Sequence, residues 1–503
     1  MLARGVGRMS RTGLAAAQRT QAISRHMMST SSSSRASKVE VGDENLVLFE
    51  SAGHVRKYTL NRERQLNALN EPMLNLLRHY VEDFVRSDLG KVLVGTGKGR
   101  AFCAGGDVAT VANNATKVET RSKAVEFFLR EFELDYLLAA VNKPYIAVMD
   151  GITMGGGVGL SANAPFRIAT EKTLFAMPET KIGYAPDVGA SFFLSRVDGE
   201  LGTYLGLTGE NIGGRAVFEH GLATHFVPSR RIPGLIENLN ALDNPTFAHV
   251  DSLIEECYSE REPDEPTSSF VGAKRAALDF AFRHDKVESI VEDLKAIGNK
   301  HEAEDVRIWA QETLDTLHLR SPTSLRIALT AIRRGKTMTL LEALQMELNF
   351  AAAICNGETP DFVTGVRAVL VEKLKNGRPS WSPPTLEEVS QSDVVNKFFK
   401  KYSPAQGNAP ALAVSEDLVP KDYKIAHPMR WALPTEEEIG KMVTGSHPSS
   451  GSTQITSAEL VKKFEDLRNH KNGVREKVLE VVQRRCKEVE DKTSGMKYLA
   501  WVR

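Results

Sequence analysis

The chain has 503 residues, of which 42% are hydrophobic and 25% are charged, and its 64 basic side chains balance 64 acidic ones. This composition predicts a soluble globular protein with one large domain and appendages, or with two to three average domains. A net charge of zero argues against a surface that binds DNA or a membrane as a whole, although local patches are compatible with it. No apolar run approaches the roughly 20 residues of a membrane-spanning helix, so we expect no membrane span.

Residues 1–38 differ in composition from the rest of the chain. They hold seven arginine or lysine residues and a serine-rich run over 29–34, and the first acidic residue is Glu40. An arginine-rich and serine-rich segment without acids is typical of a mitochondrial transit peptide, and a disordered basic tail is the alternative. We therefore predict a protein of the mitochondrial matrix whose transit peptide is cleaved between about residues 27 and 38.

The segment that follows predicts alternating strands and helices. Apolar residues alternate on both sides of Ser51–His54, which indicates a hairpin, and a helix is predicted over about 67–86. A short buried strand over 91–94 then leads into a glycine-rich turn at Gly99–Asp107. This order of strand, glycine turn and helix is typical of α/β layering with a functional site at the turns.

The same order repeats further along the chain. We predict a long helix over 119–141, a strand over 145–149, a second glycine-rich turn at Gly151–Gly159 that opens a helix over 157–162, and strands over 166–169 and 173–176. Residues 240–350 are mostly helical by pattern, with helices from Ser321 and over 339–353.

The two glycine-rich turns carry the strongest functional signal. Glycine lets the main chain approach a ligand closely, so two such turns can direct backbone N–H groups at one oxygen atom. Such a pair of donors forms an oxyanion hole, which acyl chemistry needs when a carbonyl becomes tetrahedral. Taken singly, each turn could be an ordinary tight turn without a ligand. The carboxylates of Glu179 and Asp187 downstream favour a site for acyl transfer.

Four motifs in order resemble one known family over residues of about 45–400. They are Arg100–Asp107, Gly151–Leu160, Phe175–Thr180 with Pro186–Gly189, and Gly365–Leu370. Together they resemble the crotonase (enoyl-CoA hydratase/isomerase) superfamily and, within it, the 3-hydroxyisobutyryl-CoA hydrolase branch. The resemblance implies an α/β fold, a crotonase-type spiral of ββα units, followed by a helical C-terminal region. It also implies an acyl-CoA substrate.

The resemblance assigns roles to five residues. The backbone N–H groups of Gly106 and Gly156 match the oxyanion donors, and Glu179 matches the catalytic carboxylate, either as nucleophile or as general base. Asp187 matches a residue that orients Glu179 or positions water. Glu131 matches a glutamate that contacts the substrate's 3-hydroxyl group, although its helix is rich in acids and could present a solvated face.

Position 159 separates the activities of the family. Family hydratases carry a glutamate two residues after the glycine triplet, whereas this chain has Gly159. The resemblance therefore implies hydrolysis of 3-hydroxyisobutyryl-CoA to 3-hydroxyisobutyrate and CoA, a step of valine degradation. Enoyl-CoA hydratase or isomerase activity is the lesser alternative.

Three arginines are candidates for holding CoA, which is part of the substrate; no other cofactor is expected. Arg62, Arg64 and Arg100 match segments that contact the nucleotide in the family and could pair with its phosphates. The sequence shows no metal-ligand cluster, so no metal is expected. The four cysteines are scattered, and Cys103, beside the first glycine turn, is interpreted as a packing residue.

The last 100 residues have no counterpart in the hydrolase branch. We divide the chain into a transit peptide (1–38), a crotonase-like domain (39–403, helix-rich from about 240) and a C-terminal extension (404–503). The extension contains linkers, a capping box at Thr435–Glu438, and one charged amphipathic helix predicted over 458–492. The apolar stripe predicted for this helix is Leu460, Phe464, Leu467, Val474, Val478 and Val481. That helix either packs on its own domain or docks on a partner. Fungal relatives with such tails are associated with the mitochondrial small ribosomal subunit, which is the alternative function.

Overall fold

A computed structural model describes residues 45–374, 377–420, 423–451, 454–490, 492 and 495–502. The predicted transit peptide lies outside this part. From Asn45 onward the chain forms one compact unit. No helix within the described residues has the length and apolar character needed to cross a membrane.

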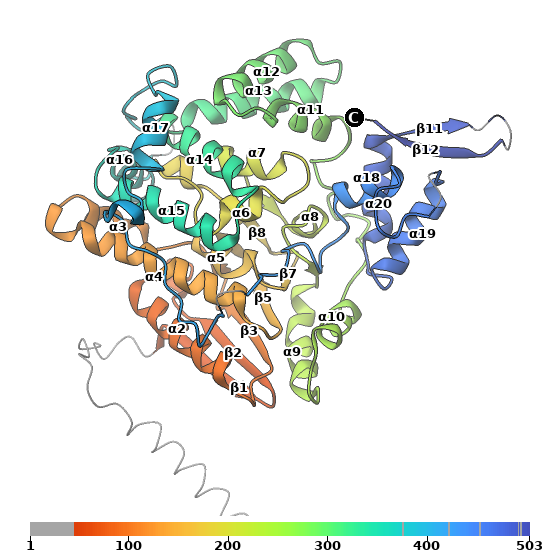
Figure 1. Ribbon diagram of the computed structural model, residues 1–503, viewed down its shortest axis with the longest axis horizontal. Coiled ribbons are helices and arrows are strands. Elements are labelled where there is room, and N and C mark those ends of the chain that lie inside the picture. The colour runs from red at the N-terminus through yellow and green to blue at the C-terminus, as the bar shows by residue number, and fades with distance from the viewer. Residues whose placement is uncertain are drawn as a thin grey trace, which may run out of the picture. The chain divides into compact units, whose positions relative to one another are not determined.

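Two sheets carry the fold, and Figure 1 shows the larger one running from β1 at the lower edge of the view up to β7 near the middle. The larger sheet has the order β1-β2-β3-β5-β7-β10, in which β1 and β2 form an antiparallel hairpin and the other neighbours are parallel. The smaller sheet has the order β4-β6-β8-β9. The bounds are β1 Val47–Ala52, β2 Val55–Leu60, β3 Val92–Gly97, β4 Ala101–Cys103, β5 Tyr145–Met149, β6 Ile152–Met154, β7 Phe166–Ala169, β8 Leu174–Ala176, β9 Ile212–Gly213 and β10 His225–Phe226.

The sheets are built from a repeated ββα unit. In each repeat one strand joins the larger sheet, the next strand joins the smaller sheet, and a helix follows: β3-β4-α3, then β5-β6-α5, then β7-β8-α6. Strands β4, β6 and β8 are parallel neighbours, so their carboxyl ends lie at one edge of the smaller sheet. The two glycine turns and Glu179 follow these three ends. This topology brings the predicted site together and confirms the crotonase-type α/β fold.

Helices cover both sheets and make up most of the chain after β10. Asn70 caps α2 by accepting a hydrogen bond from the Met73 amide. The helices are α2 Glu71–Arg86, α3 Val108–Ala115, α4 Arg121–Ala140, α5 Gly156–Ala162, α6 Ala190–Leu194, α7 Leu201–Thr208, α8 Arg215–Glu219, α9 Ile232–Ala241, α10 Phe247–Glu256, α11 Gly272–Phe282, α12 Val287–Lys300, α13 Glu304–Leu319, α14 Pro322–Gly335, α15 Leu340–Cys355, α16 Asp361–Val366 and α17 Gln391–Phe398. The predicted hairpin, strands and glycine-turn helix are confirmed, with ends that differ by a few residues.

The C-terminal extension folds differently from the prediction. The capping box is confirmed at the start of α18 (Glu436–Val443), but the single helix predicted over 458–492 is wrong. Helix α19 (Ser457–Leu467) and helix α20 (Val474–Arg485) are separated by a turn, and β11 (Cys486–Glu490) pairs with β12 (Lys497–Trp501).

The turn has a clear local cause. Asn469, His470 and Gly473 adopt positive φ angles of 50°, 55° and 84°, a left-handed conformation that ends a helix and that asparagine and glycine tolerate best. The predicted apolar stripe survives the break, because α20 folds back on α19 and both helices bury it. Its buried members are Leu460, Phe464, Val474, Val478 and Val481, whereas the expectation for Leu467 is wrong, because this side chain beside the turn is 41% exposed.

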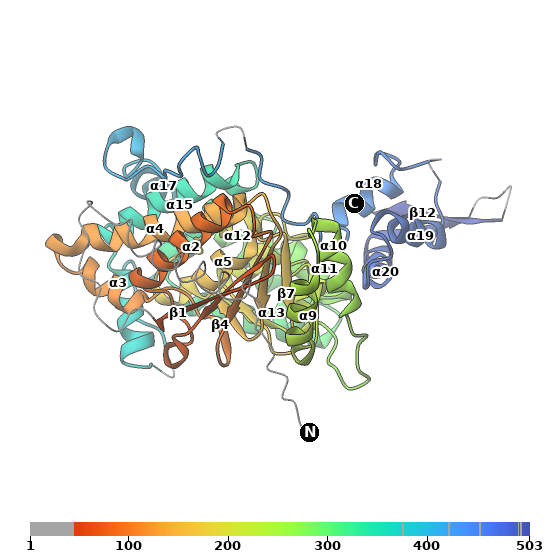
Figure 2. The same ribbon diagram turned by 90° about the horizontal axis from the view of Figure 1, so that it is seen from below.

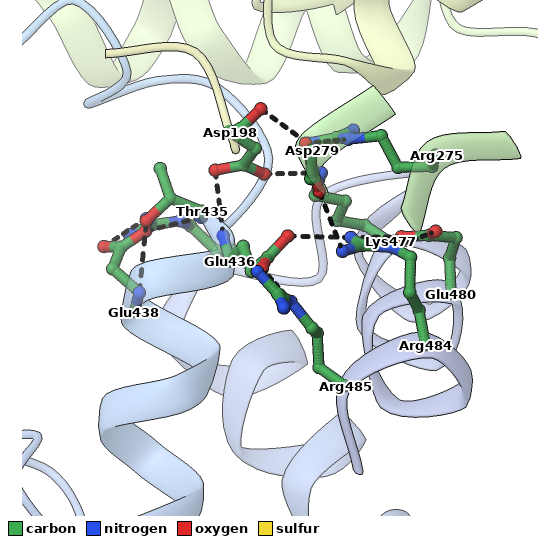
Figure 3. Close-up of polar contacts among 11 residues, drawn as sticks. Asp198, Arg275, Asp279, Thr435, Glu436, Glu438, Lys477, Glu480, Arg484 and Arg485 are labelled. Carbon is green, nitrogen blue, oxygen red and sulfur yellow. Dashed lines mark hydrogen bonds and ion pairs between the residues drawn. The ribbon is translucent and has the colours of Figure 1, made fainter. Parts of the chain in front are cut away.

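Helices α18 and α20 are joined to the rest of the unit by a seam of ion pairs (Figure 3). Lys477 Nζ lies 2.7 Å from Asp198 Oδ2, and Asp198 Oδ1 accepts a hydrogen bond of 2.9 Å from the Glu436 amide. Arg484 contacts both Glu436 at 2.7 Å and Asp279 of α11 at 3.5 Å. Figures 1 and 2 both show α20 beside α11. Of the two alternatives for this segment, the structure therefore shows packing on its own chain.

Candidate active site

The two glycine turns meet at the edge of the smaller sheet. Gly105 and Gly155 have positive φ angles of 108° and 46°, which favour glycine. A Cβ atom on Gly155 would lie 3.4 Å from Gly105 Cα, and one on Gly105 would lie 3.8 Å from the Gly156 amide nitrogen. Main chain therefore packs against main chain here, and no side chain separates the two turns.

The Gly106 and Gly156 backbones line one cavity of about 250 Å³. Gly156 is the first residue of α5, so its N–H belongs to the helical turn that has no acceptor within the helix, and the helix dipole adds positive potential there. Gly106 follows the end of β4 and pairs with Leu69 in a short parallel bridge. Two such amides at one cavity are suited to bind an oxygen atom that gains negative charge.

Glu179 lies opposite the second glycine turn. It begins a short 3-10 helix, Glu179–Ile182, directly after Pro178, and its side chain is 7% exposed. A Cβ atom on Gly155 would lie 3.0 Å from Glu179 Oε1, so only glycine leaves room for the carboxyl group. Among the described residues, Oε2 has no hydrogen-bond partner, which leaves it available to a substrate.

Asp187 reaches the same cavity from a strained turn. Its side chain is 4% exposed, and the next two residues, Val188 and Gly189, have positive φ angles of 55° and 84°. This conformation is rare for a β-branched residue such as valine and costs on the order of 1–3 kcal/mol. The strain places Asp187 beside Tyr184, whose pKa is raised well above its ordinary value by burial and by the Asp187 charge.

Glu131 points into the interior rather than to solvent. It is 2% exposed, and its Oε1 occupies the space beside Gly156 that a Cβ atom there would need. The same oxygen would lie 3.8 Å from a Cβ atom on Gly106. The alternative that Glu131 lies on a solvated face of its helix is therefore wrong. The exposed part of α4 carries Glu126 instead, whose Oε1 lies 2.9 Å from Arg130 Nε.

The cavity thus collects every site residue that the sequence predicted, apart from the arginines. Its polar lining is Glu131, Glu179, Asp187, Tyr184 and Lys181, and its apolar lining includes Val108, Phe127, Phe128, Ile182, Val369 and Leu370. The last two lie on a π-helix, Arg367–Val371, within the Gly365–Leu370 motif, which explains that motif as part of the cavity wall. Within the described residues, no group of three or more His, Cys, Asp or Glu side chains is arranged to hold a metal.

Burial favours the protonated form of the carboxyl groups that line the cavity. It raises the pKa of Glu179 to about 8, and burial together with the Glu179 charge raises the pKa of Glu131 to about 8. Burial and the charges of Glu131, Glu179 and Glu347 raise the pKa of Asp187 well above its ordinary value. Carboxyl groups that compete for protons in one pocket can divide acid and base roles between them.

Two further buried acids lie behind the cavity and were missed from the sequence. Asp135 is four residues after Glu131 on α4, so it lies on the same helical face. Glu347 comes from α15, far along the chain. The spacing of Glu131 and Asp135 could have revealed the first, but no sequence signal identifies the second.

The structure separates the three candidate arginines. Arg62 is held in the protein, with its Nη2 donating to Asp107 Oδ2 at 2.9 Å and its Nη1 donating to the Ala68 carbonyl at 3.0 Å. Arg64 and Arg100 are both exposed. Their loops lie next to each other, since the Glu63 side chain is only 2.6 Å from the place that a Cβ atom on Gly99 would take. None of the three lines the cavity, and their contact with CoA stays a prediction.

Cys103 behaves as a packing residue. It is fully buried, its thiol donates to the Gly105 carbonyl at 3.6 Å, and burial raises its pKa to about 12. Such a thiol has almost no thiolate at neutral pH and is a poor nucleophile. All four cysteines are free.

A family model described as enoyl-CoA hydratase/isomerase matches residues 55–399. In solved structures, a carnitinyl-CoA dehydratase from Mycobacterium thermoresistibile has a TM-score of 0.62 and 33% identity, over 71% of this chain and 96% of that one.

Two kinds of relative resemble the chain over different lengths. The human mitochondrial 3-hydroxyisobutyryl-CoA hydrolase is 40% identical over 70% of this chain and 88% of its own length, and hydrolase 1 of Arabidopsis thaliana is 38% identical over 75% and 99%. The small ribosomal subunit protein mS47 of Neurospora crassa is 36% identical over 94% of this chain and 91% of its own. The similarity to mS47 therefore reaches further along this chain than the similarity to either hydrolase.

Proposed function

The chain belongs to the enoyl-CoA hydratase/isomerase (crotonase) family, and we propose that within it the chain is a 3-hydroxyisobutyryl-CoA hydrolase. One observation carries the proposal: the Gly106 and Gly156 backbones meet Glu179 and Asp187 in one buried cavity. Relatives named as hydrolases at about 40% identity support the same reaction. The position of this reaction in valine degradation is part of the proposal.

The surroundings of Gly159 support hydrolysis over hydration. A Cβ atom at this position would lie 2.6 Å from Asp135 Oδ2 and 2.7 Å from the Val188 Cβ. These distances are shorter than any ordinary carbon contact, so the glutamate that family hydratases carry here cannot be accommodated without rearrangement. A hydratase mechanism would therefore lack one of its two carboxylates.

In the proposed reaction, the thioester carbonyl oxygen lies between the two glycine amides. Ionised Glu179 attacks the carbonyl carbon, the C–S bond breaks, and the CoA thiolate leaves with the proton that the Asp187 carboxyl group donates. Water then cleaves the resulting anhydride, giving its proton to Asp187 and restoring Glu179. Alternatively, Glu179 acts as a general base on water directly. Either route consumes one water and releases one acid and one CoA.

The remaining predicted contacts fit around this centre. Glu131 Oε1 has no hydrogen-bond partner in the described part of the chain, so it is available to the 3-hydroxyl group of the substrate. Exposed Arg64 and Arg100 are better placed than Arg62 to pair with CoA phosphates, because Arg62 is already paired with Asp107. The basic N-terminal segment and the mitochondrial names of the relatives support a mitochondrial location, with the matrix as the expected compartment.

The direct test is release of free thiol from a panel of short hydroxyacyl-CoA thioesters. We expect 3-hydroxyisobutyryl-CoA to give the highest kcat/KM, with negligible hydration of an enoyl-CoA measured in parallel. Hydration without thiol release would instead assign the chain to the hydratases of the family. Thiol release that is fastest with another acyl group would keep the hydrolase but change its substrate.

We propose a role in the mitochondrial small ribosomal subunit as a second function, in addition to catalysis. The supporting observation is the length of the similarity: mS47 matches 94% of this chain, whereas the hydrolases of human and Arabidopsis match 70% and 75%. The extension is folded on its own chain, so docking would use its exposed surface rather than a disordered arm. Hairpin β11–β12 presents such a surface, with Val489 54% exposed and Lys487 exposed on the same face of β11.

Replacing Lys487 and Val489 together with glutamate is expected to abolish co-sedimentation with the small subunit in mitochondrial lysate. The two glutamates would repel the phosphates of RNA and would also place charges in an apolar protein contact. The rate of hydrolysis should stay within about twofold, because the hairpin is remote from the cavity. Point variants are preferable to deletion of residues 404–503, because deletion would remove Lys477 from partly buried Asp198 and Arg484 from partly buried Asp279. The matched control changes exposed Leu89 and Lys286 to glutamate and should still co-sediment. A wild-type protein that never co-sediments at low salt would refute the ribosomal role.

A further inference from the structure

The strained turn that carries Asp187 needs an external support. Val188 and Gly189 are both left-handed, and consecutive residues of this kind persist only where the surroundings determine them. Within the turn itself, the Ala190 amide donates to the Asp187 carbonyl at 2.8 Å. That one bond closes the turn but leaves the amides of Gly189 and Ser191 directed into the protein interior.

Glu347 of α15 accepts those amides. The Gly189 amide donates to Glu347 Oε2 at 2.6 Å, and the Ser191 amide donates to Oε1 at 2.9 Å. The Ser191 hydroxyl also donates to Oε1. Glu347 is completely buried, and all three of these donors belong to the segment directly after Asp187. Burying a carboxyl group in the interior costs free energy of folding unless hydrogen bonds compensate the loss of water.

The acids that face Glu347 make its position costlier still. Asp187 comes from the turn and Asp135 from α4, and the Glu347 charge contributes to the raised pKa of both. Burial raises the pKa of Glu347 itself to about 7, against its hydrogen bonds with Ser191 and Gly189, which lower it. A hydrophobic residue would pack here without the cost of burying an acid among other acids. The contribution of Glu347 to the structure is therefore its three hydrogen bonds to the turn.

We propose that Glu347 is a positioning residue that holds Asp187 in the cavity through the amides of Gly189 and Ser191. This inference deepens the proposed hydrolase function and rests on it for the role of Asp187. Glu347 does not line the cavity, so it would act on the reaction only through the turn. Its loss should impair the step that uses Asp187 more than it impairs substrate binding.

The test is Glu347→Gln, assayed at pH 8. Glutamine keeps the size of the side chain but places an NH₂ donor against the amide of Gly189 or of Ser191, so the turn loses part of its support. We expect kcat to fall about tenfold to a hundredfold, with KM within about twofold of wild type. Ser191→Ala is the matched control, because it removes the hydroxyl donor and keeps both amide bonds, and kcat should stay within about threefold.

A double-mutant cycle distinguishes positioning from general loss of structure. If Glu347 acts through Asp187, adding Glu347→Gln to Asp187→Asn should lower kcat by less than about twofold further. Equal effects in both backgrounds, or an unchanged kcat in Glu347→Gln alone, would overturn the inference while leaving the hydrolase function intact.

Hydrogen exchange gives a reading that needs no activity. The amides of Gly189 and Ser191 should exchange faster in Glu347→Gln, with those of α15 unchanged. If the wild type released no thiol from any acyl-CoA, the proposed function would fail, and this exchange would still decide whether Glu347 supports the turn. Unchanged exchange of the two amides would overturn the support role.

Discussion

Replacing Glu179 with glutamine is expected to lower kcat for thioester hydrolysis by about a thousandfold or more. Glutamine has nearly the same shape but is neither a nucleophile nor a base, and a positioned acid or base alone contributes about 10²–10⁴-fold. KM should change little, because the cavity walls and the glycine amides remain. The measurement is steady-state thiol release, compared with Glu237→Gln, an exposed glutamate on α9 that should keep wild-type kinetics.

The same substitution has a consequence for pH. Because burial raises the pKa of Glu179 from 4.5 to about 8, its ionised fraction in the free protein is small at neutral pH. The wild-type kcat/KM should therefore rise with pH up to about 8 and then level off. The folded protein also binds more protons than the unfolded chain between these two pKa values, so burial of this acid makes the fold less stable as the pH rises from 4.5 to about 8.

The Glu179→Gln variant lacks the titrating group. Its free energy of unfolding should therefore fall less than that of the wild type as the pH rises from 4.5 to about 8. At pH 8 the variant should be at least as stable as the wild type in denaturant titrations. An inactive variant that is clearly less stable at every pH would point to a structural role for Glu179. Full activity in the variant would remove Glu179 from the mechanism.

The sequence predicted the cavity well because its parts lie directly after strand ends. Gly106, Gly156 and Glu179 each follow a strand of the smaller sheet, and motifs at such places have fixed spacing and fixed backbone requirements. Asp187 was found through its Pro-Asp-Val-Gly motif, and the structure shows that Val188 and Gly189 of this motif are left-handed. At these four residues the backbone conformation and the functional group lie in the same short motif, so the sequence motif alone predicts them.

The parts that the sequence did not give depend on contacts between distant segments. Glu347 is 160 residues after Asp187 and meets its turn only through the packing of α15 on α6. The break between α19 and α20 depends on a few residues around His470, inside a segment whose helical periodicity continues on both sides. Periodicity reports which face is buried but not whether the helix reverses, because a reversal that keeps the stripe inside leaves the pattern intact.

The Asp198–Lys477 and Glu436–Arg484 ion pairs also connect segments that are distant in the sequence, so the sequence pattern did not predict them. In the sequence these side chains belong to an ordinary charged surface pattern. In the structure Lys477 pairs with Asp198 and joins the extension to the crotonase fold, whereas Arg484 pairs with Glu436 and joins α20 to α18 within the extension. Although burial alone would raise it, Arg484 and Arg485 lower the pKa of Glu436 to about 2. Such pairs set where the extension lies, because an unpaired charge at this seam would be costly.

Gly156→Ala is expected to reduce kcat/KM by about a hundredfold, comparable to the loss of one oxyanion donor. The φ angle at Gly156 is not left-handed, so alanine meets no backbone strain there. Its Cβ atom would instead overlap Glu131 Oε1 and lie 3.2 Å from Leu69 Cδ1. Glu131 is buried on all other sides, so it must move into the substrate cavity or force the first turn of α5 away from the thioester oxygen.

The double variant Gly156→Ala/Glu131→Ala separates this clash from other effects of the added methyl group. With the glutamate truncated, the methyl group has space, and the two losses should combine to less than their product. Gly234→Ala on α9 is the matched control, since a Cβ atom there meets nothing within 4 Å and alanine favours a helix. It should leave kcat/KM unchanged and raise the melting temperature slightly. If Gly156→Ala kept wild-type kcat/KM, the expected displacement of Glu131 or of the residue 156 amide by the added methyl group would be wrong.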